Sequence, residues 1–227
     1  IDLLSISKST DNYNFHSHTQ FCDGRANMED FVKAAVEEGI LHYGFSPHGP
    51  VKIESPCNMP FSTVEPYLAA VERLRGIYGG KISLYSSMEV DYFDDWNATD
   101  PYFHSLGLDY IIGSVHFIPA FVNPREYVDI DGCYEAFNRK MGEYFHNDIE
   151  AVVRSFYAQS MKMIEKGGFD VIGHFDKIGH NAGHYRKGIE LEPWYEKLVR
   201  TEFEAIMDYG YIIEINTKAL ADHHRFF

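Results

Sequence analysis

Hydrophobic and polar positions follow two different periods along this chain. Short runs rich in β-branched and aromatic residues are separated by longer segments in which apolar residues recur every three or four positions. Such alternation is typical of repeated βα units around a parallel sheet. The pattern predicts strands at Tyr13 to His16, His42 to Ser46, Ile82 to Met88, Tyr110 to Ser114, Val171 to His174 and Tyr211 to Asn216.

Amphipathic helices are expected between these strands, packed on the outside of the sheet. The predicted segments are Met28 to Glu38, Val64 to Tyr78, Tyr134 to Glu165 with a break near Asn147 and Asp148, and Glu192 to Tyr209 with Pro193 in the first turn. Two long polar stretches, Gly49 to Ser62 and Pro119 to Gly132, are expected to be irregular loops over a site.

Composition narrows the class of protein. A chain of 227 residues is within the range of a single α/β barrel domain. The formal net charge of −14 argues against nucleic acid as a partner, because binding to phosphate backbones depends on Lys and Arg. Three cysteines without a CxxC spacing indicate neither a disulfide framework nor a zinc knuckle, and they favour a cytoplasmic protein. No apolar run is long enough to predict a membrane span or a signal peptide.

Metal-ligating side chains recur at one end of the predicted strands. The carboxyl ends of parallel strands meet on one face of a barrel, where active sites are built. A single histidine in such a place is more often structural, but repetition in five successive βα units favours a common site. The side chains lie at or just after the strand ends: His16 and His18 at the first strand, His48 at the second, Glu89 at the third, His116 at the fourth and His174 at the fifth.

The chemistry of these side chains is that of a transition-metal site. His16 and His18 share one face of an extended chain, and the turn that contains Asp23 can return a carboxylate to that strand end. Imidazole combined with carboxylate suits zinc, iron or manganese. Glu89 can bridge two ions, although a solvated loop acid is the alternative, and Asp91 is a candidate acceptor that orients a ligating histidine.

These motifs resemble those of the polymerase and histidinol phosphatase (PHP) superfamily, and within it the histidinol-phosphate phosphatases. The matching segments, in family order, are NFHSHTQFCDG, GFSPHGP, PFSTVEPYLAAVERL, SMEVDYF, LDYIIGSVHFI, GGFDVIGHFDKI and YIIEINTKAL. The resemblance implies an α/β fold, a distorted TIM-like (βα)7 barrel of the PHP type, with residues 1–227 forming one domain.

The resemblance also implies two to three divalent metal ions, with Zn, Mn or Fe as candidates. The first ion would bind to His16, His18 and Glu89, the second to Glu89, His116 and His174, and the third to Asp23 and His48. Some relatives carry His where this chain has Asp23, so the identity of the metal stays open. We assign Glu89, Asp23 and His48 to catalysis as well.

One family motif has no clear counterpart. The family closes its site with an Asp-x-His motif on a seventh strand, whereas this chain offers only Asp222, His223 and His224 in polar sequence without a strand signal. We therefore expect the seventh strand to be missing, because the natural chain continues past Phe227 or because a segment is absent from this sequence. The domain is then C-terminally incomplete.

The phosphate group needs cations besides the metals. Arg154, Lys177 and Arg186 are predicted to bind substrate, Arg154 first among them because similar phosphatases carry an Arg in this helical region. A surface role is the alternative for each. Glu214 and Asn216 at the end of the sixth strand could contact substrate or belong to the rim of the core.

The activity implied by the resemblance is hydrolysis of a small phosphomonoester, expected to be L-histidinol phosphate in histidine biosynthesis. Two alternatives stay open: a different substrate for a phosphoesterase of the same superfamily, and a non-catalytic metal-binding relic. The expected partner is a small phosphate ester, with no nucleic acid and no membrane. The sequence leaves the oligomeric state open.

Overall fold

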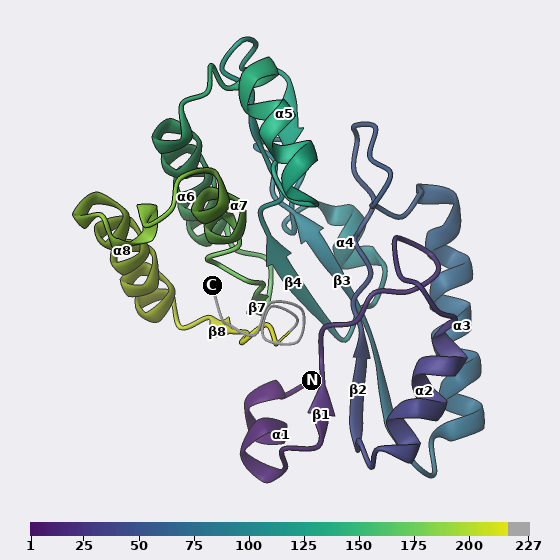
Figure 1. Ribbon diagram of the computed structural model, residues 1–227. Helices are drawn as coiled ribbons and strands as arrows, with labels where there is room; N and C mark the ends of the chain where they lie inside the picture. Colours follow the sequence, from purple (N-terminus) through teal and green to yellow (C-terminus); the bar gives the residue numbers. More distant parts are fainter. Residues whose placement is uncertain (218–227) are drawn as a thin grey trace. The chain divides into compact units, whose positions relative to one another are not determined.

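The computed structural model describes residues 1–217, in which strands and helices alternate along the chain (Figure 1). The strands are β1 (Tyr13–Asn14), β2 (His42–Phe45), β3 (Ser83–Asp91), β4 (Tyr110–Ser114), β5 (Phe117–Pro119), β6 (Tyr127–Asp129), β7 (Val171–Ile172) and β8 (Ile212–Ile213). The α-helices are α1 (Leu3–Ser9), α2 (Met28–Glu37), α3 (Val64–Tyr78), α4 (Pro101–Ser105), α5 (Tyr134–Tyr144), α6 (Ile149–Lys166), α7 (Ile178–Tyr185) and α8 (Pro193–Tyr209).

The chain forms two compact units. The first contains Ile1–Asp91, Ala98–Ile112 and Gly168–Asp170, and the second contains Tyr92–Asn97, Gly113–Gly167 and the chain from Val171 onward. Strand β4 therefore begins in the first unit and ends in the second. The expectation of a single domain over residues 1–227 stays a prediction.

The first unit is built on parallel strands. Strand β2 pairs with β1 through Tyr13 and His42, and with β3 through Phe45 and Ser86. Most residues of β2 and β3 are buried, as is usual for parallel strands that are covered on both faces. Helix α3 packs on β3 and lies beside α2 (Figure 1).

A buried tyrosine joins α3 to the ends of two strands. Tyr67 is fully buried, and its hydroxyl lies 2.9 Å from the carbonyl oxygen of Phe45 and 2.7 Å from that of Ser87. The same hydroxyl accepts the N–H of Ser87 at 3.1 Å. Tyr67 thus fixes β2 and β3 just before the residues that carry His48 and Glu89.

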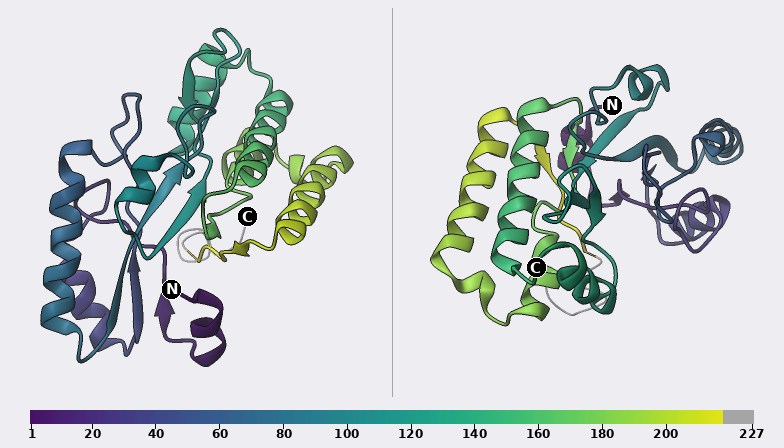
Figure 2. Two further views of the ribbon diagram at one scale, coloured as in Figure 1. Left: turned by 180° about the vertical axis from the view of Figure 1, so that it is seen from behind. Right: turned by 90° about the horizontal axis from the view of Figure 1, so that it is seen from above.

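The second unit combines the end of β4 with β7, β8 and a layer of helices. Strands β7 and β8 are parallel, and the N–H of Gly173 donates to the carbonyl oxygen of Gly113 at 3.0 Å. Helices α6 and α8 lie side by side in both views of Figure 2, and α7 contacts α5 and α6. Strands β5 and β6 form a separate antiparallel pair.

The structure confirms all six predicted strands and the break between α5 and α6, but it corrects one loop and several boundaries. Pro119 to Gly132 was expected to be irregular, yet it contains β6, which pairs with β5. Three-residue strands paired across a turn give too short a pattern to recognise. Strands β1, β7 and β8 are two to four residues shorter than predicted, because the chain leaves the regular ladder before its polar strand-end residues.

No helix among residues 1–217 has both the length and the apolar character needed to cross a membrane. All three cysteines are free.

Candidate metal centre

The sequence that follows β1 aims two imidazoles at one carboxylate. Ser17 points the other way, where its hydroxyl is hydrogen-bonded to that of Tyr43 at 2.7 Å and its N–H donates to Ser46 Oγ at 2.9 Å. His16 and His18, on either side of Ser17, have their Nε2 atoms 3.3 and 3.1 Å from Glu89 Oε2. The alternation of an extended chain thus explains why both rings reach the same oxygen.

A tight turn returns Asp23 to His18, as the sequence predicted. The N–H groups of Cys22 and Gly24 both donate to the carbonyl oxygen of Thr19, at 3.1 and 2.9 Å. Asp23 Oδ1 then lies 2.7 Å from His18 Nδ1. Gly24 is required here, because a Cβ atom at this position would lie 2.5 Å from the backbone nitrogen of Thr19.

His48 and Glu89 are placed by neighbouring backbone segments. The N–H of Glu89 donates to the carbonyl oxygen of Pro47 at 3.0 Å, and the N–H of Gly49 donates to that of Glu89 at 2.7 Å. This parallel bridge brings His48 Nδ1 to 3.1 Å from Glu89 Oε2. Glu89 is completely buried, so three imidazoles gather around one buried carboxylate oxygen.

The electrostatics of this cluster keep the carboxylate of Asp23 ionised. Burial alone would raise the pKa of Asp23, but the hydrogen bond and charge of His18 outweigh it and hold the pKa well below its usual range. Burial likewise favours neutral His18, while Asp23 and Glu89 act in the opposite sense and raise its pKa. The first unit therefore concentrates negative charge beside imidazole nitrogens, which suits a cation.

The donor atoms fit divalent metal ions. His16, His18 and Glu89 each offer an atom within 4.8 Å of the others, and so do His18, Asp23 and His48. Imidazole and carboxylate together suit Zn, Fe or Mn. The near contacts of 3.1 to 3.3 Å between ring nitrogens and Glu89 Oε2 have the spacing of ligands around a shared ion.

The second unit brings His116 and His174 together. They follow β4 and β7, are 5% and 7% exposed, and have their Nε2 atoms 3.2 Å apart. The N–H of His174 donates to Glu214 Oε1 at 2.8 Å, so Glu214 fixes the backbone of a predicted ligand. The expectation that all seven predicted ligands share one cavity stays a prediction.

The three predicted phosphate-binding cations lie in different surroundings. The Nζ atom of Lys177 is 3.3 Å from Asp131 Oδ2, and its backbone N–H donates to the carbonyl oxygen of His174 at 2.9 Å. Arg154 and Arg186 instead meet at Trp194, with their guanidinium carbons 4.7 and 5.9 Å from the centre of the ring. Of these three residues, Lys177 has a backbone contact with a predicted ligand in the part of the chain that the structure describes.

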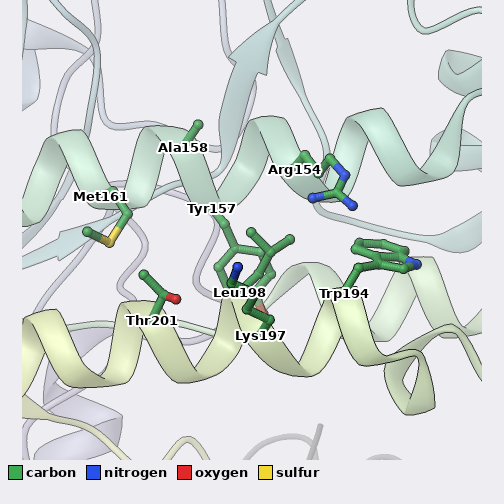
Figure 3. A pocket seen from close by; sticks show the side chains of 8 residues that line it. All are labelled: Arg154, Tyr157, Ala158, Met161, Trp194, Lys197, Leu198 and Thr201. Carbon is green, nitrogen blue, oxygen red and sulfur yellow. The ribbon is translucent and has the colours of Figure 1, made fainter.

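Arg154 also lines a cavity of about 490 Å³ between α6 and α8 (Figure 3). Its guanidinium donates to Glu150 Oε1 at 2.7 Å and covers one face of Trp194. Arg186 pairs with Glu192 at 2.9 Å. The role of Arg154 and Arg186 in substrate binding stays a prediction.

Two acidic residues near the second-unit histidines were not predicted. Burial would raise the pKa of Asp131, but Lys177, His116 and His174 together outweigh it and hold the pKa well below its usual range. Burial raises the pKa of Asp176, two residues after His174. Asp131 could have been predicted only from the β5 and β6 pair that precedes it, and the sequence pattern did not predict that pair.

Asp91 has a clear structural contact. Its Oδ2 atom accepts the Nδ2–H of Asn58 at 2.8 Å, and the same amide donates to the carbonyl oxygen of Gly49 at 2.8 Å. The first unit therefore uses Asp91 to hold the irregular segment after His48. Asp222, His223 and His224 lie outside the described residues.

Comparison with known proteins decides the family. The model of the PHP domain matches residues 14–218. The chain belongs to the PHP domain family. The match spans every predicted ligand, from His16 to His174, and confirms the resemblance inferred from the motifs.

Curated relatives of this PHP protein are histidinol phosphatases by name. The chain is 28% identical over 177 residues to a probable histidinol-phosphatase from Deinococcus radiodurans, a match that covers 73% of this chain and 62% of the relative. It is 24% identical over 224 residues to the histidinol-phosphatase of Bacillus subtilis, covering 90% of this chain and 80% of that protein. The chain thus spans less than two thirds of the Deinococcus relative.

Solved structures share the fold of this PHP protein. The putative histidinol phosphatase HisK from Listeria monocytogenes superposes with a TM-score of 0.79 at 18% identity, covering 92% of this chain and 83% of that one. A histidinol phosphate phosphatase from Lactococcus lactis, solved with zinc, L-histidinol and phosphate, gives a TM-score of 0.64 at 17% identity, covering 93% and 74%. The predicted α/β class, the distorted TIM-like barrel of the PHP type, is confirmed by these likenesses.

Proposed function

We propose that the protein is a metal-dependent phosphomonoester hydrolase whose substrate is L-histidinol phosphate. The observation that carries this proposal is the convergence of His16, His18 and His48 on the buried Oε2 atom of Glu89, within 3.3 Å. The His116 and His174 pair supplies the remaining predicted ligands. The names of the curated relatives support the substrate.

The metal ligands are proposed to be seven side chains that bind two to three divalent ions. When bound, such ions activate water for attack on phosphorus and stabilise charge on the leaving oxygen. Zn, Mn and Fe all suit the donor set. The proposed ligands are His16, His18, Asp23, His48 and Glu89 in the first unit, and His116 and His174 in the second.

The protein's own residues bind, orient and discriminate. Glu89 acts as the central carboxylate, Asp23 fixes the ring of His18, and Asp91 with Asn58 orders the segment after His48. That segment, 49–62, is proposed to meet the imidazole or ammonium of the leaving group. The substrate is a small phosphate ester, and a cytoplasmic location remains the prediction from cysteine content.

Replacing Glu89 tests the proposal. Glu89→Gln keeps the volume of the side chain but removes the charge around which three imidazoles gather, so we expect it to lose metal and phosphatase activity together. Bound metal is measured by elemental analysis and activity by phosphate release from L-histidinol phosphate. Glu37→Gln, at an exposed site at the end of α2, is the control.

Full activity and normal metal content in Glu89→Gln would contradict the proposed centre. If the natural protein binds its metals but hydrolyses a different phosphate ester, the proposed metal centre stands and the proposed substrate is wrong. Metal binding without hydrolysis of any ester by the natural full-length protein would favour a metal-binding relic.

A further inference from the structure

A loop of the second unit is fastened beside the second pair of predicted ligands. Ile130 follows β6, and its N–H donates to the carbonyl oxygen of His116 at 2.9 Å. The buried side chain of Asn181, on α7, donates to the carbonyl oxygen of Ile130 at 3.1 Å. The loop is therefore tied to the end of β4 and to the helix that follows His174.

Asp131 follows Ile130 in this loop, which connects β6 to α5. Its N–H donates to Asp129 Oδ1 at 2.7 Å, which bends the loop locally. Lys140, on α5, donates to the backbone oxygen of Asp129 at 2.7 Å and to its Oδ2 at 3.1 Å. Because Lys140 is engaged with Asp129, the carboxylate of Asp131 meets a different cation.

That cation is Lys177, whose Nζ atom lies 3.3 Å from Asp131 Oδ2. Lys177 is 20% exposed and Asp131 is 31% exposed, so the pair is half-buried. The backbone of Lys177 is also fixed, since its N–H donates to the carbonyl oxygen of His174. The backbone of Lys177 is therefore held by His174, a predicted ligand, and its ammonium group by Asp131.

We propose that Lys177 binds the phosphoryl group of the substrate and that Asp131 is the positioning residue that holds its ammonium group there. This inference rests on the proposed function. A lysine ammonium has three donors, and Asp131 occupies one of them, which leaves donors for phosphoryl oxygens. Hydrogen bonds from a charged donor to phosphate are strong, and a protein of net charge −14 needs such a cation locally.

The surroundings of the other two cations favour this choice. Arg154 and Arg186 are 46% and 40% exposed, and each is paired with a glutamate and lies against Trp194. Lys177 has a backbone contact with His174, which neither arginine has among the described residues. Lys177 is therefore the predicted cation best placed to reach a phosphoryl group beside the His116 and His174 pair.

The test is the affinity of the metal-loaded, full-length protein for inorganic phosphate, measured by calorimetry. Lys177→Met keeps the length of the side chain but removes its charge, and we expect phosphate to bind about 10- to 100-fold more weakly. Lys177→Arg is expected to stay within about threefold of the parent, because it retains the charge. Asp131→Asn is expected to weaken binding by an intermediate factor, since the ammonium is no longer held.

A double variant separates positioning from an independent role. If Asp131 acts through Lys177, Asp131→Asn has no further effect on phosphate affinity in the Lys177→Met background. The matched control is Lys162→Met, which removes an exposed lysine paired with Asp94 at 3.1 Å and should leave phosphate affinity unchanged. Metal content and thermal unfolding of each variant show whether its fold and metals are intact.

Kinetics on L-histidinol phosphate give a second readout. Lys177→Met is expected to raise KM more than it lowers kcat, because the contact exists in both the ground state and the transition state. Unchanged phosphate affinity in Lys177→Met, with its metals bound, would overturn the inference. Additive losses in the double variant would overturn the role of Asp131.

The inference and the proposed function fail in different ways. If the natural protein hydrolyses L-histidinol phosphate but Lys177→Met binds phosphate normally, only the inference is wrong. If the natural protein does not hydrolyse that ester but Lys177→Met binds inorganic phosphate more weakly, the proposed substrate is wrong and the inferred phosphate site stands.

Discussion

We expect Glu202 to make the stability of the protein depend on pH. Its side chain is completely buried between α6 and α8, where it accepts a hydrogen bond from Ser160 Oγ. Burial raises the pKa of Glu202 from 4.5 to about 8, although the Ser160 hydrogen bond acts in the opposite sense, and Asp176 adds to the rise. The folded protein therefore holds a proton that the unfolded chain releases above about pH 4.5.

The sign and size of the effect follow from proton linkage. Between pH 4.5 and about 8 the folded state binds one more proton than the unfolded state, so the free energy of unfolding falls as pH rises. Each pH unit costs about 1.4 kcal/mol, which over this window amounts to about 3 to 5 kcal/mol. The contribution of Glu202 is complete below pH 4.5 and is lost as the pH rises to about 8.

Glu202→Gln removes the titration and keeps the shape. We expect the variant to be no more stable than the parent near pH 5 and more stable than the parent by about 2 to 4 kcal/mol near pH 8. Urea unfolding at a series of pH values gives the free energy of unfolding of both proteins. The titration of all other groups cancels in the difference between the two.

Glu196→Gln is the control, because Glu196 lies on the same helix, is 67% exposed and pairs only at the surface with Arg200. Its difference from the parent should be small and independent of pH. A difference between Glu202→Gln and the parent that does not change with pH would refute the reasoning.

Two further variants test the framework around the candidate metal centre. Gly24→Ala should lose metal without losing the fold, because the new Cβ would clash with the backbone of Thr19 and displace the turn that carries Asp23. Elemental analysis measures the metal content and circular dichroism the fold, and unchanged metal content would contradict the role of this turn. Tyr67→Phe should lower the free energy of unfolding by about 1 to 3 kcal/mol, because it leaves buried backbone groups of β2 and β3 without their hydrogen-bond partner. Urea unfolding measures this free energy, and a change below about 0.5 kcal/mol would contradict the prediction.

The grouping of the proposed metal ligands could be predicted because similar side chains follow successive strands. His16, His18 and Glu89 could be grouped from sequence since the carboxyl ends of neighbouring parallel strands meet. The structure brings both imidazoles to within 3.3 Å of Glu89 Oε2. Asp23 could be added to this group because only four residues separate it from His18, and so short a turn keeps its carboxylate close to the strand end. The exact strand ends could not be predicted, since the ladder stops where polar side chains take over.

Features that depend on long-range packing could not be predicted from the sequence. The β5 and β6 pair consists of three-residue strands, so neither has a recognisable period, and Asp131 was missed along with them. The positions of Arg154 and Arg186 depend on how α8 presents Trp194 to α6, which no local pattern records. Charge and sequence proximity alone therefore could not distinguish Lys177 from the two arginines.

The most direct test of the account is the kcat/KM of the natural full-length protein for L-histidinol phosphate, compared with that for an aryl phosphate, with Zn²⁺, Mn²⁺ or Fe²⁺ supplied. The metals activate any phosphoryl group, so discrimination must come from contacts to the imidazole and ammonium of the leaving group. The account predicts a preference for L-histidinol phosphate of at least about 100-fold. Equal values for the two esters, or no turnover with any of the three metals, would contradict it.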